Sequence, residues 1–244
     1  MYRSIFKCQS FPSSLNVGFI DINIHHEPSH GAYLCQCEFD PARCDTETAQ
    51  VLGITLPHSI LRSVKKRRAE FIAGRYMAKL CLKHFSVADY DVDIGAHREP
   101  IWPLDIIGTI SHCANQAVAL VAKRSSYRFV GIDIERFINK RNAEYIGFNI
   151  HDKYEFSLLL EQGFSNSVIT TLIFSAKESL FKAIFSYIKK YIDFECARVT
   201  EVNIHEQSLV LVLKPSLSYY CCGCNEFKCY YFMTETSVTT IILA

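Results

Sequence analysis

The chain has 244 residues, of which 49% are hydrophobic and 21% are charged, a composition typical of folded globular proteins. That length suits one large domain or two domains of about 120 residues, and it is enough to bury a substantial core. The formal net charge is +1, which argues against duplex nucleic acid as a partner.

The amino-terminal residues give no targeting signal. Residues 1–15 carry scattered polar side chains and lack the long apolar stretch of a secretion signal. No segment approaches the roughly 20 apolar residues that a membrane-spanning helix needs. We therefore expect a cytoplasmic monomer with no membrane span and no nucleic-acid partner.

The chain contains eleven cysteines, an odd number that does not suggest a disulfide framework. Two groups, at 35–44 and 221–229, lack the paired C-x2-C spacing of a structural zinc site. Adjacent side chains of a strand diverge, so His112 and Cys113 do not indicate a nucleophilic pair. The sequence favours reduced, mostly buried cysteines over a zinc site.

In the first half, hydrophobic periodicity predicts two early strands, a long helix and an apolar pair of strands. In chain order these are strands 17–24 and 32–39, a helix from a candidate cap at Ser59 to about residue 85, and strands 108–113 and 117–122. Residues 91–105 read as a loop, because Gly95, Pro100 and Pro103 surround the only tryptophan, Trp102.

The second half repeats this order of strand, long helix and strands. The predicted elements are a strand at 129–134, a helix from about 169 to 191, and strands at 199–204, 209–213, 228–233 and 238–243. We predict an α+β fold of two similar α+β halves in a pseudo-two-fold arrangement, with the active site between them. The predicted domains are residues 1–125 and 126–244.

Acidic residues fall on both the central strand and the long helix of the second half. Strand alternation places Asp133 and Glu135 on one face, while Ile132 and Ile134 point into a core. On the helix, Glu178 and Lys182 are four residues apart and therefore neighbours. Three carboxylates with a lysine beside them suit a hard cation such as Mg²⁺ that handles phosphate.

Each of these patterns also has a purely structural explanation. Ser175 and Glu178 fit a capping box at the start of a helix. Asp133 and Glu135 fit a solvated strand face, and the basic run 65–68 fits a solvated helix face. No single pattern predicts a function, so the interpretation depends on their combination and order.

Five blocks, taken together in their order, resemble the 4′-phosphopantetheinyl transferases. They are R-R-A-E-F-I-A-G-R at 67–75, R-E-P-I-W-P at 98–103, G-T-I-S-H-C at 108–113, G-I-D-I-E at 131–135 and F-S-A-K-E-S at 174–179. The last two are common to the larger, surfactin-synthetase-activating type, while A-G-R and R-E-P-x-W-P mark the enterobactin synthetase component D branch. The resemblance spans roughly residues 60–185. Thr109 and Asp105 depart from the usual serine and glycine, and neither has a charged role in the family.

The resemblance implies an enzyme that moves the phosphopantetheine arm of coenzyme A to a serine of an apo carrier domain, releasing adenosine 3′,5′-bisphosphate. It assigns Asp133, Glu135 and Glu178 as ligands of Mg²⁺. It further makes Glu178 the general base, directly or through a water, and Lys182 the group that stabilises charge on the pyrophosphate or the leaving bisphosphate. The implied carrier belongs to a siderophore, other non-ribosomal peptide, polyketide or fatty-acid synthase.

The resemblance also implies where coenzyme A binds. Arg67 and Arg75 are eight apart on the predicted helix, near enough to one face to grip the 3′-phosphate with help from His112. Whether Arg67 or Arg68 is the family's arginine stays open. The loop 97–100 is expected along the adenine and ribose, with Ser111 close to the phosphates. The full set of expected contacts is Arg67, Arg75, His97, Arg98, Glu99, Pro100, Ser111, His112 and Asp133.

The polar segment 139–162 lies between the carboxylate strand and the long helix, and it is the predicted docking surface for the carrier. Two other functions are compatible with clustered carboxylates: a Mg²⁺-dependent phosphodiesterase, and a non-catalytic subunit of a synthetase complex. The near-zero net charge argues against the first, and the presence of all three carboxylates with Lys182 argues against the second. The particular carrier and pathway, the choice between Mg²⁺ and Mn²⁺, and the use of acylated coenzyme A stay open.

Overall fold

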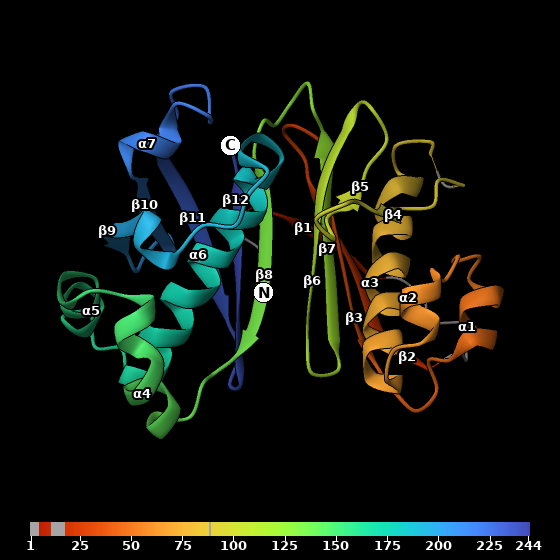
Figure 1. Cartoon of the computed structure of the whole chain (residues 1–244), viewed down its shortest axis with the longest axis horizontal. Coiled ribbons are helices and arrows are strands. Elements are labelled where there is room, and N and C mark those ends of the chain that lie inside the picture. The colour runs from red at the N-terminus through yellow and green to blue at the C-terminus, as the bar shows by residue number, and fades with distance from the viewer. Residues whose placement is uncertain (1–4, 11–17, 88) are drawn as a thin grey trace. The chain divides into compact units, whose positions relative to one another are not determined.

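The structure is a computed structural model that describes residues 5–10, 18–87 and 89–244. The chain divides into two compact units, residues 2–127 and residues 128–244. Each unit contains a five-stranded antiparallel sheet and one long helix (Figure 1). This mixed architecture confirms the α+β class predicted from the sequence.

The sheet of residues 2–127 has the strand order β1-β2-β3-β7-β6. Its strands are β1 Lys7–Ser10, β2 Phe19–Glu27, β3 Ala32–Phe39, β6 Ile106–Cys113 and β7 Gln116–Lys123. The long helix α3, Lys65–Lys83, packs on this sheet through its contacts with β3 and β7. Two short helices precede it, α1 Thr46–Val51 and α2 His58–Leu61.

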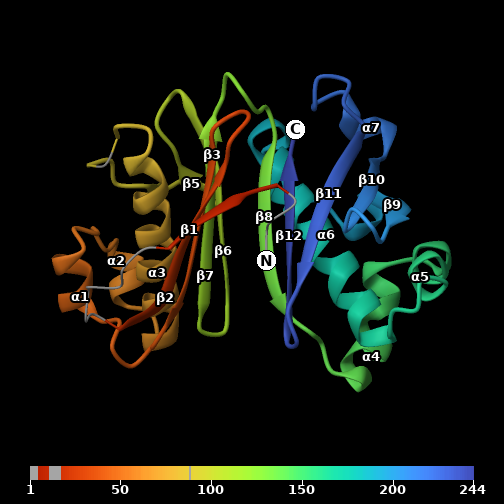
Figure 2. The same ribbon diagram turned by 180° about the vertical axis from the view of Figure 1, so that it is seen from behind.

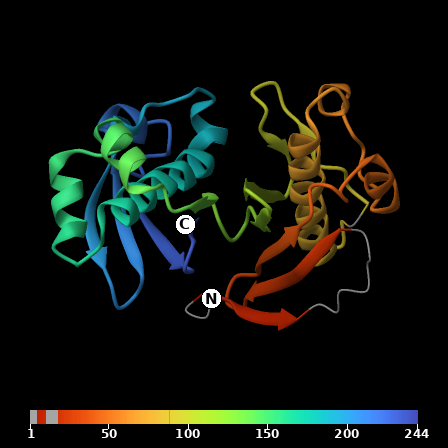
Figure 3. The same ribbon diagram turned by 90° about the horizontal axis from the view of Figure 1, so that it is seen from below.

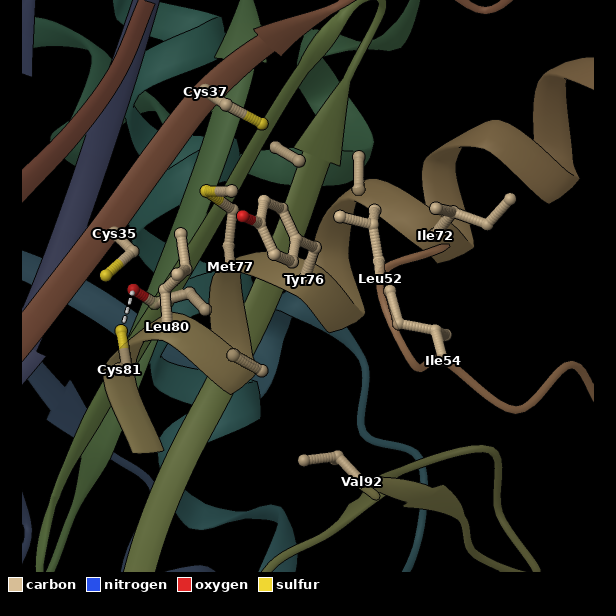
Figure 4. Packing of buried hydrophobic residues seen from close by; sticks show 14 of the residues in the cluster. Cys35, Cys37, Leu52, Ile54, Ile72, Tyr76, Met77, Leu80, Cys81 and Val92 are labelled. Carbon is tan, nitrogen blue, oxygen red and sulfur yellow. Dashed lines mark hydrogen bonds between the residues drawn. The ribbon is translucent and has the colours of Figure 1, made fainter. Parts of the chain in front are cut away.

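The core of this unit lies between α3 and the sheet. Cys35 and Cys37 are two residues apart on β3 and therefore share the face that packs with Tyr76 and Met77 of α3 (Figure 4). The thiol of Cys81 donates to the Ala119 carbonyl at 3.6 Å. None of the ten cysteines whose side chains are described forms a disulfide, and burial raises the pKa of the Cys35 and Cys37 thiols. These thiols are protonated packing groups.

The sheet of residues 128–244 has the strand order β8-β12-β11-β10-β9, and Figure 2 shows β8, β12 and β11 side by side. Its strands are β8 Val130–Arg136, β9 Ala197–Asn203, β10 Ser208–Leu213, β11 Glu226–Met233 and β12 Ser237–Leu243. The long helix α6, Asn166–Ile188, covers one face of this sheet, as the teal helix over blue strands in Figure 3 shows. The remaining elements are α4 Lys140–Ile150, α5 Lys153–Leu160, the 3-10 turn Phe194–Cys196 and α7 Pro215–Ser218.

Three details of the predicted elements are wrong. The helix expected from Ser59 is two helices, because the Ser63 hydroxyl donates to the Ile60 carbonyl at the end of α2 and Val64 is extended. Ser59 lies inside α2, and the N-cap of α3 is Val64, which makes no side-chain cap. The expected loop 91–105 contains a small hairpin of β4 Asp93–Ile94 and β5 Pro100–Ile101.

Other predictions differ at their ends. The first strand was expected from Val17, which lies outside the described residues, and it runs on to Glu27. The polar segment 139–162 is mostly helical, because Asn139 and Asp152 cap α4 and α5 with their side chains. No helix in the described ranges combines the length and apolar character needed to cross a membrane.

Candidate active site

Helix α6 carries the F-S-A-K-E-S block in its middle. The helix begins at Asn166 after an N-cap at Ser165, and it ends where Lys189 adopts a left-handed conformation. Ser175 and Glu178 therefore lie well inside α6, and the capping-box explanation of Glu178 is wrong. The side chain of Glu178 is available for chemistry.

Gly131 lets β8 and α6 approach each other closely. A Cβ atom at this position would lie 2.0 Å from the Ser179 carbonyl oxygen, so only glycine fits. Because side chains alternate along a strand, Asp133 and Glu135 share the face of Gly131, which α6 covers. Ile132 points to the other face and is fully buried, as predicted.

Asp133 is held from two directions by α6. Its Oδ1 accepts a hydrogen bond from Lys182 Nζ at 2.7 Å, and its Oδ2 accepts one from the Ser175 hydroxyl at 2.9 Å. The side chain of Asp133 is 5% exposed and that of Lys182 is 25% exposed. A paired cation and hydrogen bonds offset the cost of burying a carboxylate.

Glu178 is half-buried one helical turn before Lys182. Burial raises the pKa of its carboxyl, the charge of Asp133 raises it further, and Lys182 opposes the shift. A carboxylate whose pKa moves up toward neutrality is suited to accept a proton. Beside it lies a cavity of about 160 Å³. Its lining includes Glu178, Phe181, Tyr191 and Phe194.

The chemistry of these donors fits a hard cation. Within the described part of the chain, no three His, Cys, Asp or Glu side chains lie close enough together to hold a metal ion. Mg²⁺, however, needs only one or two carboxylates when phosphate and water complete its shell. Asp133 and Glu178 repel each other, and a cation between them would relieve that repulsion. Glu135, half-buried on the same strand, is a further oxygen donor.

A second cluster of charged groups lies in residues 2–127. Arg67 Nη1 is 2.8 Å from His112 Nε2, and because arginine can only donate, that ring nitrogen accepts. The carboxylate of Glu70 lies 3.6 Å from Arg67 Nη1 and 3.7 Å from His112 Nδ1. Glu70 thus orients both side chains from one side. Ser111, buried on β6, precedes His112.

Arg75 completes this cluster and has a spare donor. Its guanidinium lies over the Phe71 ring at 4.6 Å and donates from Nη2 to the Asp93 carbonyl at 3.2 Å. Its Nε is buried and has no hydrogen-bond partner among the described residues. Burial, and then the charge of Arg67, lowers its pKa to about 10. Two neighbouring guanidinium groups and an unsatisfied donor are features that suit an anion.

Arg68 is placed differently from Arg67. Its Nη1 donates to the Leu61 carbonyl at 2.9 Å, next to α2. The structure therefore places Arg67 next to His112 and close enough to Arg75 to affect its pKa, and it places Arg68 beside the Leu61 carbonyl.

The hairpin β4–β5 carries the remaining predicted contacts for coenzyme A. The Glu99 carboxylate folds back to accept from the His97 backbone N–H at 2.8 Å. Arg98 is exposed in a left-handed conformation at φ 69°, and Pro100 begins β5. The bond from Arg75 to the Asp93 carbonyl ties this hairpin to α3.

Comparison with known proteins decides the family. The sequence profile of the 4′-phosphopantetheinyl transferase N-terminal domain matches residues 57–122, and that of the 4′-phosphopantetheinyl transferase superfamily matches residues 129–239. The chain belongs to the 4′-phosphopantetheinyl transferase superfamily. The protein is therefore a transferase enzyme of a family that uses coenzyme A and acts on carrier proteins.

Several curated relatives are similar over most of their length. Enterobactin synthase component D of Escherichia coli K12 is 36% identical over 159 residues, which are 64% of this chain and 72% of the relative. Its counterpart in Salmonella typhimurium is 33% identical over 188 residues, 77% of this chain and 76% of the relative. The 4′-phosphopantetheinyl transferase PptT of Mycobacterium tuberculosis is 32% identical over 142 residues, 58% of this chain and 61% of the relative. These similarities confirm the resemblance to the enterobactin synthetase component D branch that the motifs predicted.

Two residues near these clusters were missed from the sequence. Thr240 contacts Ser175 across the interface of β12 and α6, but strand register is not visible in a single sequence. Glu70 sits within the block 67–75 and could have been found, since it is three residues after Arg67 on the predicted helix.

Proposed function

We propose that this protein transfers phosphopantetheine from coenzyme A to a carrier domain in the assembly of a siderophore or another non-ribosomal peptide. The observation that carries the proposal is the grouping of Glu178 with the Asp133–Lys182 pair on α6 and β8. The name enterobactin synthase component D, carried by several relatives, supports a siderophore pathway.

Each unit supplies one part of the binding machinery in this proposal. Arg67, Arg75 and His112 grip the 3′-phosphate of coenzyme A, and the buried Nε of Arg75 gains the partner that it lacks. The hairpin segment 97–100 lies along the adenine and ribose, and Ser111 donates to a phosphate.

Asp133 and Glu178 would hold Mg²⁺, with Glu135 as a further oxygen donor on the same strand and phosphate and water completing the shell. The ion, when bound, would neutralise charge on the pyrophosphate. Glu178, directly or through a water, takes the proton of the carrier serine while the serine oxygen forms a bond to the β-phosphorus. The bond between that phosphorus and the bridging oxygen breaks, and adenosine 3′,5′-bisphosphate leaves. Lys182 stabilises the negative charge on the departing group.

The cavity beside Glu178 is suited to the pantetheine arm. Its volume is about 160 Å³, and Phe181, Tyr191 and Phe194 give it aromatic walls. The Phe181 and Tyr191 rings stack with centroids 5.8 Å apart and form one aromatic wall of the cavity. The methyl and methylene groups of the pantetheine arm can pack along this wall.

The carrier docks on α4 and α5 in this proposal, which are the helices of segment 139–162. Tyr145, Phe148 and Tyr154 are 77%, 74% and 53% exposed, and aromatic side chains are enriched at protein interfaces. Replacing Tyr145 and Phe148 with alanine should raise KM for the carrier about tenfold and leave KM for coenzyme A unchanged. Unchanged carrier affinity would rule this surface out.

Intact-protein mass spectrometry of a purified apo peptidyl carrier domain tests the proposed reaction. Incubation with the protein, coenzyme A and Mg²⁺ should add one phosphopantetheine to the carrier. The addition should disappear with a chelator and with Glu178→Gln. Failure to modify any of a panel of peptidyl, aryl and acyl carriers, while coenzyme A still binds, would overturn the proposal.

A further inference from the structure

Three buried hydroxyl groups lie behind the Asp133 carboxylate. Ser175 and Ser179 of α6 and Thr240 of β12 are all fully buried. The Thr240 hydroxyl is 2.9 Å from the Ser175 hydroxyl and 2.7 Å from the Ser179 hydroxyl. Ser175 in turn donates to Asp133 Oδ2 at 2.9 Å. The three side chains form one continuous hydrogen-bonded group that ends on the carboxylate.

Each of the three hydroxyl protons has its own acceptor. The Ser175 hydroxyl donates to Asp133 Oδ2, the Thr240 hydroxyl donates to the Ser175 carbonyl, and the Ser179 hydroxyl donates to the Thr240 carbonyl. Thr240 therefore fixes the backbone and the side chain of Ser175, and Ser175 fixes the carboxylate.

Thr240 is fixed by the sheet as well as by the helix. It is the register partner of Asp133 in the antiparallel pair of β12 and β8. Its hydroxyl also lies 2.8 Å from the Ser175 carbonyl, and its own carbonyl accepts from Ser179 at 2.9 Å. These contacts hold the Ser175 hydroxyl in one rotamer beside Oδ2, while Lys182 holds Oδ1.

We infer that Ser175 and Thr240 are positioning residues that set the orientation of the Asp133 carboxylate for cation binding. This inference rests on the proposed function and adds to it two residues that touch neither substrate nor cation. Three polar groups buried between a helix and a sheet are costly unless fully hydrogen-bonded, and alanine and valine would fill the same space more cheaply. Their one charged partner among the contacts above is Asp133.

The test uses Mn²⁺ as a paramagnetic probe, titrated by electron paramagnetic resonance into the full-length protein with coenzyme A and no carrier. Ser175→Ala should weaken Mn²⁺ binding about 10- to 100-fold, and Thr240→Val about tenfold. Thr240→Ser keeps the hydroxyl and should restore affinity to within about twofold of the wild type. Thr239→Val makes the same chemical change one residue away, on the opposite face of β12, and should leave Mn²⁺ binding unchanged.

Two results overturn the inference alone. One is wild-type Mn²⁺ affinity in both Ser175→Ala and Thr240→Val, in a protein that modifies its carrier. The other is equal weakening by Thr240→Val and Thr240→Ser, which would indicate lost packing. If the wild type neither binds Mn²⁺ with coenzyme A nor modifies a carrier, the proposed function fails and the inference falls with it. Thermal denaturation of every variant establishes that the folded protein is being titrated.

Discussion

Lys182 Nζ and Asp133 Oδ1 lie 2.7 Å apart and join the middle of α6 to β8. The lysine also donates to the Ile132 carbonyl at 3.1 Å. One side chain thus supports both the carboxylate and the backbone beside it. In the proposed reaction the same cation stabilises the leaving bisphosphate, so its structural role and its proposed chemical role would rest on one atom.

Removing that cation should destabilise the fold. Lys182→Met leaves a buried carboxylate without its partner, and we expect a loss of about 3 kcal/mol in the free energy of unfolding. Asp133→Asn combined with Lys182→Met should cost less than the sum of the two single changes, because neither charge then stays unpaired. Urea denaturation of the four proteins measures the coupling. If the losses in the free energy of unfolding were additive, the Asp133–Lys182 pair would contribute no coupling energy to stability.

Glu178→Gln should lower the rate of carrier modification about 10²- to 10⁴-fold, since the amide cannot take a proton. The same substitution should lower activity but raise the stability of the protein at alkaline pH. The folded protein raises the pKa of Glu178, so the charged form destabilises the fold once the pH exceeds the ordinary value of 4.5.

In a chelating buffer, Glu178→Gln should therefore match the wild type near pH 4 and exceed its thermal midpoint at pH 8. A variant that is less stable than the wild type at pH 8 would contradict the raised pKa of Glu178.

Arg75→Gln should raise KM for coenzyme A about 10- to 100-fold, the expected loss of a charge-assisted pair of hydrogen bonds. It should leave KM for 3′-dephospho-coenzyme A almost unchanged, because that substrate lacks the bound group. Arg68→Gln is the matched control, since Arg68 is bonded to the Leu61 carbonyl. Steady-state kinetics with both substrates separate these outcomes. If only Arg68→Gln lost the preference for coenzyme A over 3′-dephospho-coenzyme A, the 3′-phosphate would bind near Arg68 and not near Arg75.

Gly131→Ala tests the close approach of β8 and α6. A methyl group 2.0 Å from the Ser179 carbonyl cannot be accommodated without moving the helix. We expect a destabilisation of about 1–3 kcal/mol and a loss of carrier modification, because Lys182 moves away from Asp133. Gly163→Ala, at φ +87° and with nothing within 4 Å of the added carbon, measures the cost of backbone strain without a clash and should keep carrier modification. Full activity in Gly131→Ala would contradict the packing.

The sequence alone predicted the α+β class and the faces of several side chains. Strand alternation placed Asp133 opposite the buried Ile132, and helical spacing placed Glu178 next to Lys182, because both patterns are local. Local signals also misled: Ser175 and Glu178 match a capping box, although α6 begins earlier, at Asn166. Ser59 was an acceptable cap in a helix that the structure breaks at Ser63.

Contacts between distant segments could not be predicted in this way. The contact that distinguishes Arg67 from Arg68 is with His112, 45 residues away. The pairing of Thr240 with Asp133 depends on the order β8-β12 in the sheet, which connects the last strand of the chain to the first strand of its unit. The family motifs named the residues, but only the fold gives their partners.

If coenzyme A binds at Arg67 and Arg75 as proposed, the stability of the protein depends on the supply of that ligand. Like charges at this site oppose folding until a dianion arrives, so any ligand that brings two negative charges favours the native state by mass action. At a ligand concentration 100 times its Kd, that gain is about 2.7 kcal/mol. Under the proposed function, a shortage of coenzyme A would lower the fraction of this protein in its native state as well as the amount of its substrate.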